Sequence, residues 1–307
     1  MSDGTAARAT VAFSVSKKPM PLNLRGLVDA ASSALNSIKL NGISSGHHRG
    51  RTLRVKRRKH GSEQIAALAN TFFPLAQAPI TVLGDLKEWQ RWEIDCFKLL
   101  NGDEFQAFAV GPRTVCAEKL PGRSLRRMAH IGKLHTRALQ SAAAEVRRAH
   151  KLFFAAFNGP WSHGDLHMGN VIFDERNDRA RLIDFEIVHP ASMSAVSRHA
   201  DDLLGFLQDM AGTVSARQWL PFALCFLDAY GRRRVIARLT RLLVVPNGIP
   251  GFWWKIRCNF LDRGKMVRRF DALRRILESN EGDSVTEKFP LRRIATGQPS
   301  VRLVGVG

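Results

Sequence analysis

The sequence is poor in acidic side chains and in cysteine. Its 307 residues hold 27 aspartates and glutamates against 47 lysines and arginines, which leaves a net charge of +20. The four cysteines include no pair at Cys-x-x-Cys spacing, so a cysteine-based zinc site and a disulfide-rich secreted scaffold are both disfavoured. Apolar residues make up 45% of the chain, which excludes a mostly disordered protein.

The sequence also lacks a secretory signal pattern and an uninterrupted apolar run of membrane-spanning length. Its most apolar stretch, residues 65–83, contains Pro74, Pro79 and two amides, which disfavour a spanning helix. A buried helix followed by a strand is the favoured interpretation, and a segment lying on a membrane surface is the alternative. We therefore expect a cytoplasmic protein, with the membrane surface as a second location; a transit peptide at the Ala- and Arg-containing start is a weaker alternative.

The positive charge is concentrated at the two ends of the chain. Residues 1–60 hold 12 basic and 2 acidic side chains, and residues 231–307 hold 17 and 6. The residues between hold 18 and 19 and are therefore almost neutral. Basic ends suit nucleic acid, anionic lipid or a phosphorylated ligand, and composition alone leaves these three partners open.

The apolar pattern predicts a small mixed front half and a helical back half that meet at a hinge near Pro121. The expected organisation is a flexible lead over 1–22, an atypical N-terminal lobe over 23–120, a helical C-terminal lobe over 121–279 and a loose tail over 280–307. The expected elements include a helix over 86–100, strands over 105–110 and 114–120, and one continuous helix over 131–157.

Residues 161–189, WSHGDLHMGNVIFDERNDRARLIDFEIVH, contain the polar groups that phosphoryl transfer requires. Asp165 lies in a tight loop between two histidines, Asn170 follows five residues later, and Asp184 follows an apolar strand. One carboxylate can orient a hydroxyl group, while an amide and a second carboxylate can hold a hard cation such as Mg²⁺. A zinc site made from the two histidines and Asp184 is a weaker alternative, because the spacing matches no closed zinc site.

The segments HGDLHMGN and LIDFE resemble the catalytic and metal-binding loops of the protein-kinase-like superfamily. They are most similar to the aminoglycoside phosphotransferase and choline kinase branch, and also to bacterial kinases of lipopolysaccharide sugars (3-deoxy-manno-octulosonate kinases). The clear match covers roughly residues 118–210. The resemblance implies an α+β, two-lobed protein-kinase-like fold with a small antiparallel-sheet N-lobe and a mainly helical C-lobe.

The resemblance also implies a role for each polar residue of the loop. Asp165 would be the catalytic base or hydroxyl-orienting residue, supported by His163 and His167. Asn170 and Asp184 would be the metal ligands.

Two acidic positions beside the loop are also implied by the resemblance. Glu186 takes the place of the glycine that follows the metal-binding aspartate in protein kinases. Asp201 or Asp202 would brace the backbone of the catalytic loop, although both could instead favour a helix N-terminus.

The residues that would bind ATP are less clearly marked. CAEKLPGRSL, residues 116–125, resembles the linker between lobes, where the backbone of Glu118 to Leu120 would meet the adenine edge; a plain strand end is the alternative. Lys56 and Glu93 are the candidates for the lysine and glutamate that hold the phosphates in this superfamily.

The assignment of the lysine leaves alternatives open. Lys56 belongs to a basic run that could simply be a solvated face, and Lys87 is a second candidate. The sequence contains no G-x-G-x-x-G, and the three glycines of residues 42–50 are only weak evidence for a loop that covers phosphates.

The function expected from these residues is an ATP- and Mg²⁺-dependent phosphotransferase that moves the γ-phosphate to a hydroxyl acceptor. A small molecule or a glycolipid sugar is favoured over a protein serine or threonine, and the acceptor could be lipid-linked or anionic. The alternative is a kinase-like pseudoenzyme or scaffold that docks through its basic ends on an anionic membrane or, less favoured, on nucleic acid.

Overall fold

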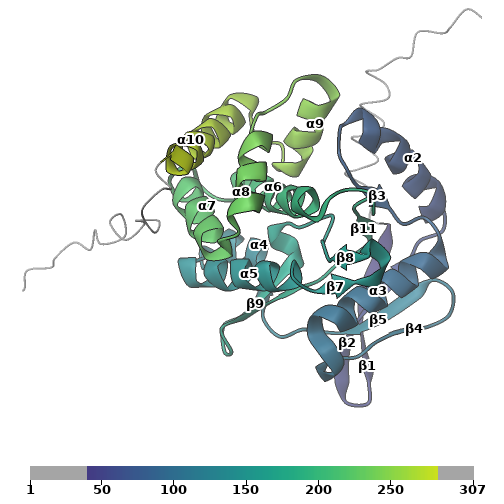
Figure 1. Ribbon diagram of the computed structural model, residues 1–307. Coiled ribbons are helices and arrows are strands. Elements are labelled where there is room, and N and C mark those ends of the chain that lie inside the picture. The colour runs from purple at the N-terminus through teal and green to yellow at the C-terminus, as the bar shows by residue number, and fades with distance from the viewer. Residues whose placement is uncertain (1–39, 283–307) are drawn as a thin grey trace, which may run out of the picture. The chain divides into compact units, whose positions relative to one another are not determined.

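The structure is a computed structural model that describes residues 40–282, with side chains up to residue 279. The predicted lead and most of the predicted tail lie outside the described residues. Strands are concentrated toward the N-terminal part and helices toward the C-terminal part, which confirms the predicted α+β class with a small antiparallel sheet (Figure 1). All described residues belong to one compact unit, so the predicted lobe boundaries stay a prediction.

A four-stranded antiparallel sheet has the strand order β1-β2-β5-β4. Its strands are β1 (Asn41–His48), β2 (Arg51–Arg58), β4 (Ala107–Ala109) and β5 (Thr114–Glu118). Arg49 and Gly50 link β1 to β2 with φ of 48° and 75°, the two left-handed residues of a tight hairpin turn. The glycines of residues 42–50 therefore belong to a strand and its turn, and their interpretation as a phosphate-covering loop stays a prediction.

The apolar stretch at residues 65–83 forms helix α2 (Ser62–Leu75) and strand β3 (Thr81–Val82), as the favoured interpretation predicted. α2 buries Phe72 and Phe73, and β3 pairs with β11 (Ile187–Val188). Across residues 40–282, no helix is both long enough and apolar enough to span a membrane.

The predicted helix at 86–100 is α3 (Leu86–Asn101). It begins where the Asp85 carboxylate accepts the backbone N–H of Glu88 at 2.8 Å, an N-cap that satisfies one of the free donors of the first turn. Trp89 is buried on this helix, as is Glu93 one turn later, so α3 carries Glu93 into the interior.

The remaining chain is mainly helical. Its helices are α4 (Leu125–His130), α5 (Thr136–Ala149), α6 (Ala195–Thr213), α7 (Ala216–Tyr230), α8 (Arg233–Leu242), α9 (Gly248–Arg257) and α10 (Arg263–Gly282). Its short strands are β6 (Arg123–Ser124), β7 (Phe153–Phe154), β8 (Gly159–Pro160), β9 (Val171–Asp174) and β10 (Arg179–Leu182).

The prediction of one continuous helix over 131–157 is wrong. Gly132 has a left-handed φ of 69°, which ends the turn that follows α4. His135 then caps α5 by accepting the backbone N–H of Ala138 at 3.3 Å. After Ala149 the chain leaves the helix and forms the small β7–β8 hairpin. The periodic apolar residues at 131–157 are therefore divided among the turn after α4, helix α5 and this hairpin.

Helix α6 is the most buried helix among the described residues. Every residue from 198 to 211 is buried, and Phe206 stacks on Phe226 of α7 with ring centroids 4.1 Å apart. Because α6 also carries Asp202 and Asp209, burying this helix brings two carboxylates against the loop at 162–170.

Candidate active site

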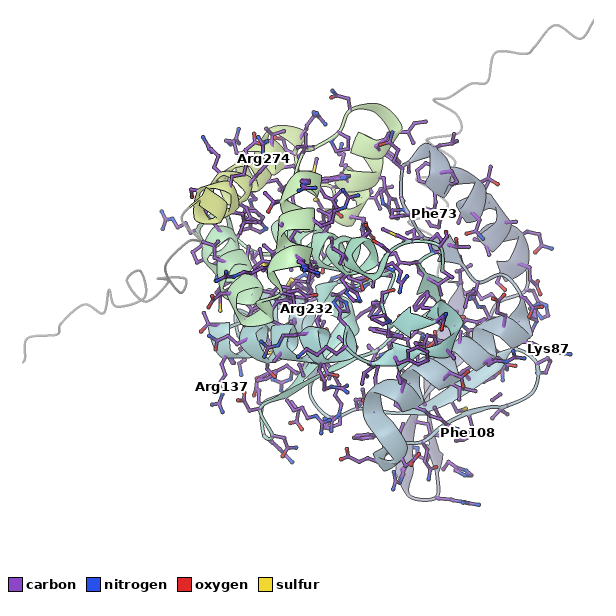
Figure 2. All side chains as sticks on the ribbon, in the orientation of Figure 1. Phe73, Lys87, Phe108, Arg137, Arg232 and Arg274 are labelled. Atoms are coloured by element: carbon purple, nitrogen blue, oxygen red, sulfur yellow. The ribbon has the colours of Figure 1, made fainter. Side chains whose placement is uncertain are left out.

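Lys56 joins the sheet to the segment that follows β10. Its Nζ lies 2.5 Å from Glu93 Oε1 on α3 and 2.6 Å from Asp184 Oδ1. The Lys56 and Glu93 side chains are only 9% and 5% exposed, so this is a buried assembly and not a solvated basic face. Lys87, the other candidate lysine, is exposed and points outward from α3 (Figure 2).

The Lys56–Asp184 pair is charged in spite of its burial. Burial alone would lower the pKa of Lys56, but the carboxylates of Asp184 and Glu93 hold that pKa above its ordinary value. Burial alone would likewise raise the pKa of Asp184, and the Lys56 ammonium holds it down at about 2. The Asp184 carboxylate is therefore ionised at neutral pH, and its oxygens could serve as ligands for a cation.

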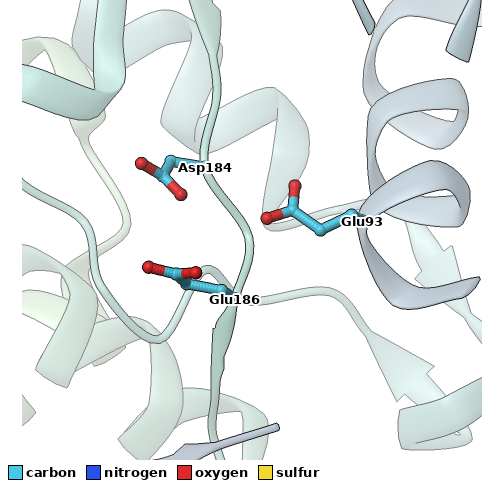
Figure 3. A group of neighbouring side chains, drawn as sticks. All are labelled: Glu93, Asp184 and Glu186. Atoms are coloured by element: carbon cyan, nitrogen blue, oxygen red, sulfur yellow. The ribbon is translucent and has the colours of Figure 1, made fainter. Parts of the chain in front are cut away.

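Glu186 adds a third carboxylate to this cluster. Oxygen atoms of Glu93, Asp184 and Glu186 all lie within 4.8 Å of one another, and Figure 3 shows Glu93 reaching from α3 toward the other two. Burial, and then the neighbouring charge of Asp184, raise the pKa of Glu186 to about 7. Three carboxylates this close could hold a cation, but in this chain Lys56 already lies among them.

Two residues that the sequence interpretation missed hold Glu186. Arg58 NH2 lies 3.8 Å from its carboxylate, and Asn41 Nδ2 of β1 donates a hydrogen bond to it. Arg58 is itself buried over the Trp89 ring at 4.8 Å. The sequence did contain a signal for Arg58. Residues two apart on a strand face the same side, and Arg58 follows Lys56 by two residues.

The loop at 162–170 is folded back on the segment that carries Asp184. His163 Nε2 lies 3.1 Å from the carbonyl oxygen of Ile183, and the backbone N–H of Ile183 donates to the carbonyl oxygen of Asn170 at 3.0 Å. Asp184 itself has a left-handed φ of 73°, a conformation that is uncommon outside glycine and often found at functional sites. The structure thus brings the predicted loop residues beside Asp184.

Within the loop, Asp165 is held by its neighbours. Asn170 Nδ2 donates to the carbonyl oxygen of Asp165 at 3.0 Å, and His167 Nε2 lies 3.6 Å from Asp165 Oδ2. Gly164 has a φ of 84°, and a Cβ there would collide with the backbone of Ile187. The glycine before Asp165 is therefore required by a close backbone approach.

Helix α6 braces both ends of the loop. Asp202 accepts the backbone N–H groups of His163 and Gly164, each at 2.8 Å, so it is Asp202 that contacts the loop. Asp201 instead faces His189 and Arg257.

The other end of the loop is held by Asp209. Its carboxylate accepts the backbone N–H of Met168 at 2.9 Å and pairs with Arg126 at 2.7 Å. The sequence interpretation missed Asp209, although its position seven residues after Asp202 places both on one face of a helix.

A cavity of about 380 Å³ opens beside the Lys56 assembly. Lys56, Glu93, Glu118, Leu120 and Asp184 line it, whereas Asp165, His163, His167 and Asn170 do not. The cavity also has apolar walls and a set of cations. The apolar residues are Phe97, Val115, Ala117, Leu120, Ile172, Ile183 and Phe185, and the cations besides Lys56 are Arg54, Lys119, Arg123 and Arg127.

The predicted adenine-binding linker is partly engaged in the sheet. The backbone N–H of Glu118 donates to Gln106 at 2.8 Å, and that of Lys119 donates to Thr52 at 2.9 Å. The Glu118 carboxylate pairs with Arg51 at 2.6 Å. Leu120 is therefore the better placed of the two predicted linker residues for a contact with a ligand in the cavity.

Comparison with known proteins adds little to this geometry. No protein-family model matches the chain, and no curated protein sequence matches it. Among solved structures, Rv3197 of Mycobacterium tuberculosis in complex with erythromycin is 20% identical, with 61% of this chain and 51% of that protein covered and a TM-score of 0.32. The chain thus spans about half the length of Rv3197.

A second solved structure with detectable similarity is the ethanolamine kinase of Plasmodium vivax. It is 9% identical, with 83% of this chain and 87% of that protein covered and a TM-score of 0.41. At TM-scores this low, neither structure assigns a function to the chain. Neither is a lipopolysaccharide sugar kinase, so that resemblance stays a prediction.

Proposed function

We propose that the chain is an ATP- and Mg²⁺-dependent phosphotransferase with a protein-kinase-like fold that phosphorylates a hydroxyl group. The observation that supports it best is the buried Lys56–Glu93–Asp184 assembly at the side of the cavity. A lysine held by a carboxylate on a helix, beside a second carboxylate that follows a strand, is the arrangement that holds and neutralises a triphosphate.

In this proposal each residue supplies one part of the chemistry. Lys56 donates to phosphate oxygens, and the apolar walls beside Leu120 accommodate the base. Asp165 orients the acceptor hydroxyl and accepts its proton. Asn170 and Asp184 would hold Mg²⁺, because an amide oxygen and an ionised carboxylate are ligands that this hard cation prefers; when bound, it neutralises phosphate charge.

Glu93 and Glu186 are less suitable as metal ligands. Glu93 is engaged by the Lys56 ammonium at 2.5 Å, and Glu186 is held by Arg58 and Asn41. Asp184 is also paired with Lys56, but its side chain is 25% exposed and lines the cavity, whereas Glu93 is 5% exposed and Glu186 does not line the cavity. We therefore assign Glu93 and Glu186 to holding Lys56 and the Asp184 segment in place.

The cations that line the cavity indicate which kinds of ligand it favours. Arg54, Arg123 and Arg127 give the cavity wall a positive charge beyond that of Lys56. Such a wall attracts anionic ligands, so it suits the triphosphate and would also favour a small or lipid-linked acceptor that carries an acidic group over a neutral one. A protein hydroxyl is the less favoured acceptor.

The test is binding and slow hydrolysis of Mg-ATP by the purified chain. Asp165→Ala should lower hydrolysis about 10²- to 10⁴-fold and leave Mg-ATP affinity unchanged, because it removes the proton acceptor and no phosphate contact. Asp184→Ala should abolish the Mg²⁺ dependence of binding. Asp178→Ala, in the exposed β9–β10 turn where Asp178 pairs with Arg137, is the matched control and should change neither. Absence of Mg²⁺-dependent binding at millimolar ATP would refute the proposal.

A further inference from the structure

A buried network of polar side chains lies against residues 161–164, just before Asp165. Its members come from the end of α5, from α6 and from the corner between α7 and α8. Tyr230, Asp202 and His199 are 0% exposed and His150 is 1% exposed. None of the four lines the cavity of the proposed active site.

The first branch of this network ends on Asp202. His150 Nδ1 lies 2.9 Å from the Tyr230 hydroxyl, and His150 Nε2 lies 3.0 Å from Asp202 Oδ2. The Asp202 carboxylate in turn accepts the backbone N–H groups of His163 and Gly164. Tyr230 thus reaches the catalytic loop through two intermediates.

The protonation of this branch follows from its chemistry. Burial lowers the pKa of His150 and raises that of Tyr230, so the imidazole is neutral and the phenol keeps its proton. Burial alone would raise the pKa of Asp202, but the hydrogen bond from His150 and nearby imidazoles bring it below its ordinary value. An ionised carboxylate only accepts, so the His150 proton lies on Nε2, and Nδ1 accepts from the Tyr230 O–H.

The second branch ends on Trp161. Arg232 NH1 lies 3.3 Å from His199 Nδ1 and donates to it, so His199 donates from Nε2 to the carbonyl oxygen of Trp161 at 2.9 Å. The His150 and His199 rings stack with centroids 3.9 Å apart. The two branches therefore support each other as well as the backbone on either side of Ser162.

We propose that Tyr230 and His150 are positioning residues for Asp165. They fix the orientation of the Asp202 carboxylate, and that carboxylate fixes the backbone of His163 and Gly164 from which Asp165 projects. The inference rests on the proposed phosphotransferase function. Asp202 fixes the imidazole tautomer, and the Tyr230 hydroxyl, which donates to Nδ1, holds the ring in the orientation that directs Nε2–H at Asp202.

The test compares Tyr230→Phe with Thr240→Val. Each substitution removes one buried hydroxyl and keeps the side-chain shape, but the Thr240 hydroxyl only bonds the carbonyl oxygen of Ile236 within α8. Two measurements are made on the full chain: amide hydrogen exchange of the peptide at 161–166, and hydrolysis together with binding of Mg-ATP.

In Tyr230→Phe we expect exchange at 161–166 to accelerate about tenfold and hydrolysis to fall about tenfold, while Mg-ATP affinity stays within about twofold. Thr240→Val should leave all three unchanged. His150→Gln, which keeps a donor for Asp202, should retain more hydrolysis than His150→Ala. A role in stability alone would instead lower the melting temperature without separating hydrolysis from affinity.

Unchanged exchange in Tyr230→Phe would overturn the inference, and so would accelerated exchange with unchanged hydrolysis. If the unmodified chain neither binds nor hydrolyses Mg-ATP, the proposed function fails. In that case the exchange measurement alone still decides whether Tyr230 and His150 hold the loop.

Discussion

At the scale of single residues, charge in the interior is permitted only where it is paired. Lys56 has two carboxylate partners. The Asp202 carboxylate accepts hydrogen bonds from two backbone N–H groups and from His150 Nε2. Removing one partner of such a group leaves a buried charge without compensation, which costs more than the pair contributed. The buried polar residues of this chain therefore define a single arrangement of the loop.

Buried neutral histidine predicts how stability depends on pH. Burial, together with the neighbouring His150, lowers the pKa of His199 to about 3 from an ordinary value of 6.5. Below pH 6.5 the unfolded chain takes up a proton that the folded chain does not, so stability is lost as the pH falls. Between pH 7 and pH 5 this loss amounts to about 2 kcal/mol for one fully shifted histidine.

Replacing His199 by Asn should therefore flatten the pH dependence of the unfolding free energy by about 2 kcal/mol between pH 7 and pH 5. Urea unfolding at the two pH values measures it. His130→Asn, at an exposed position in α4, is the control and should keep the wild-type slope. An identical slope in His199→Asn would contradict the prediction.

At the scale of elements, α6 organises the helical part because its neighbours approach it closely. A Cβ added at Gly212 would overlap the carbonyl group of Cys258 and would lie 2.9 Å from the Cβ of Asn259. A Cβ added at Gly205 would lie 2.9 Å from the carbonyl oxygen of Leu166 in the loop at 162–170. The small residues of α6 therefore set its distance from the loop and from the end of α9.

Gly212→Ala should destabilise the protein by about 1 to 3 kcal/mol, because the backbone of Cys258 cannot give way as a flexible side chain could. In an unobstructed helix the same substitution stabilises by up to about 1 kcal/mol. Gly264→Ala in α10 is the control for this sign, since a Cβ there meets only the ends of the Asp262 and Arg268 side chains. Chemical denaturation measures both, and equal shifts of the two midpoints would count against a close approach of α6 and α9.

At the scale of the whole molecule, part of the excess positive charge is concentrated on α8. The sequence contains no acidic residue between Asp228 and Asp262, and Arg234, Arg238 and Arg241 are exposed at helical spacing. They lie on one face of the helix, where their fields add. Contact with an anionic surface or polymer, the alternative function, would be expected here.

Neutralising Arg234, Arg238 and Arg241 to Gln should lower the dependence of polyanion binding on salt. With a short labelled DNA duplex as the probe, we expect the slope of log affinity against log salt to fall by about 2 to 3. Neutralising Lys87, Arg91 and Lys98 on α3 is the control and should have a smaller effect, because Glu88 and Asp95 offset them. Fluorescence anisotropy over a salt series measures the slope; equal effects of the two triple variants would refute a special role for α8.

The loop at 162–170 could be located from sequence because its polar residues are close together in the chain. Asp165, Asn170 and Asp184 fall within one short segment whose residue types and spacing are specific. The helix at 86–100 was likewise predictable, since local periodicity and a capping aspartate define it. The continuous helix at 131–157 was not, because periodicity alone does not register a left-handed glycine or a histidine cap.

The sequence by itself determined the α+β class, the location of the excess charge and the group of polar residues in one loop. Only the tertiary structure decided that Lys56, and not Lys87, meets Glu93, that Asp202 rather than Asp201 holds the loop, and that Tyr230 reaches it through His150. The reason is physical: local pattern fixes which face of an element is apolar, whereas a buried charge is placed by whichever distant partner neutralises it. Those partners come from strands and helices far apart in the chain, and packing alone brings them together.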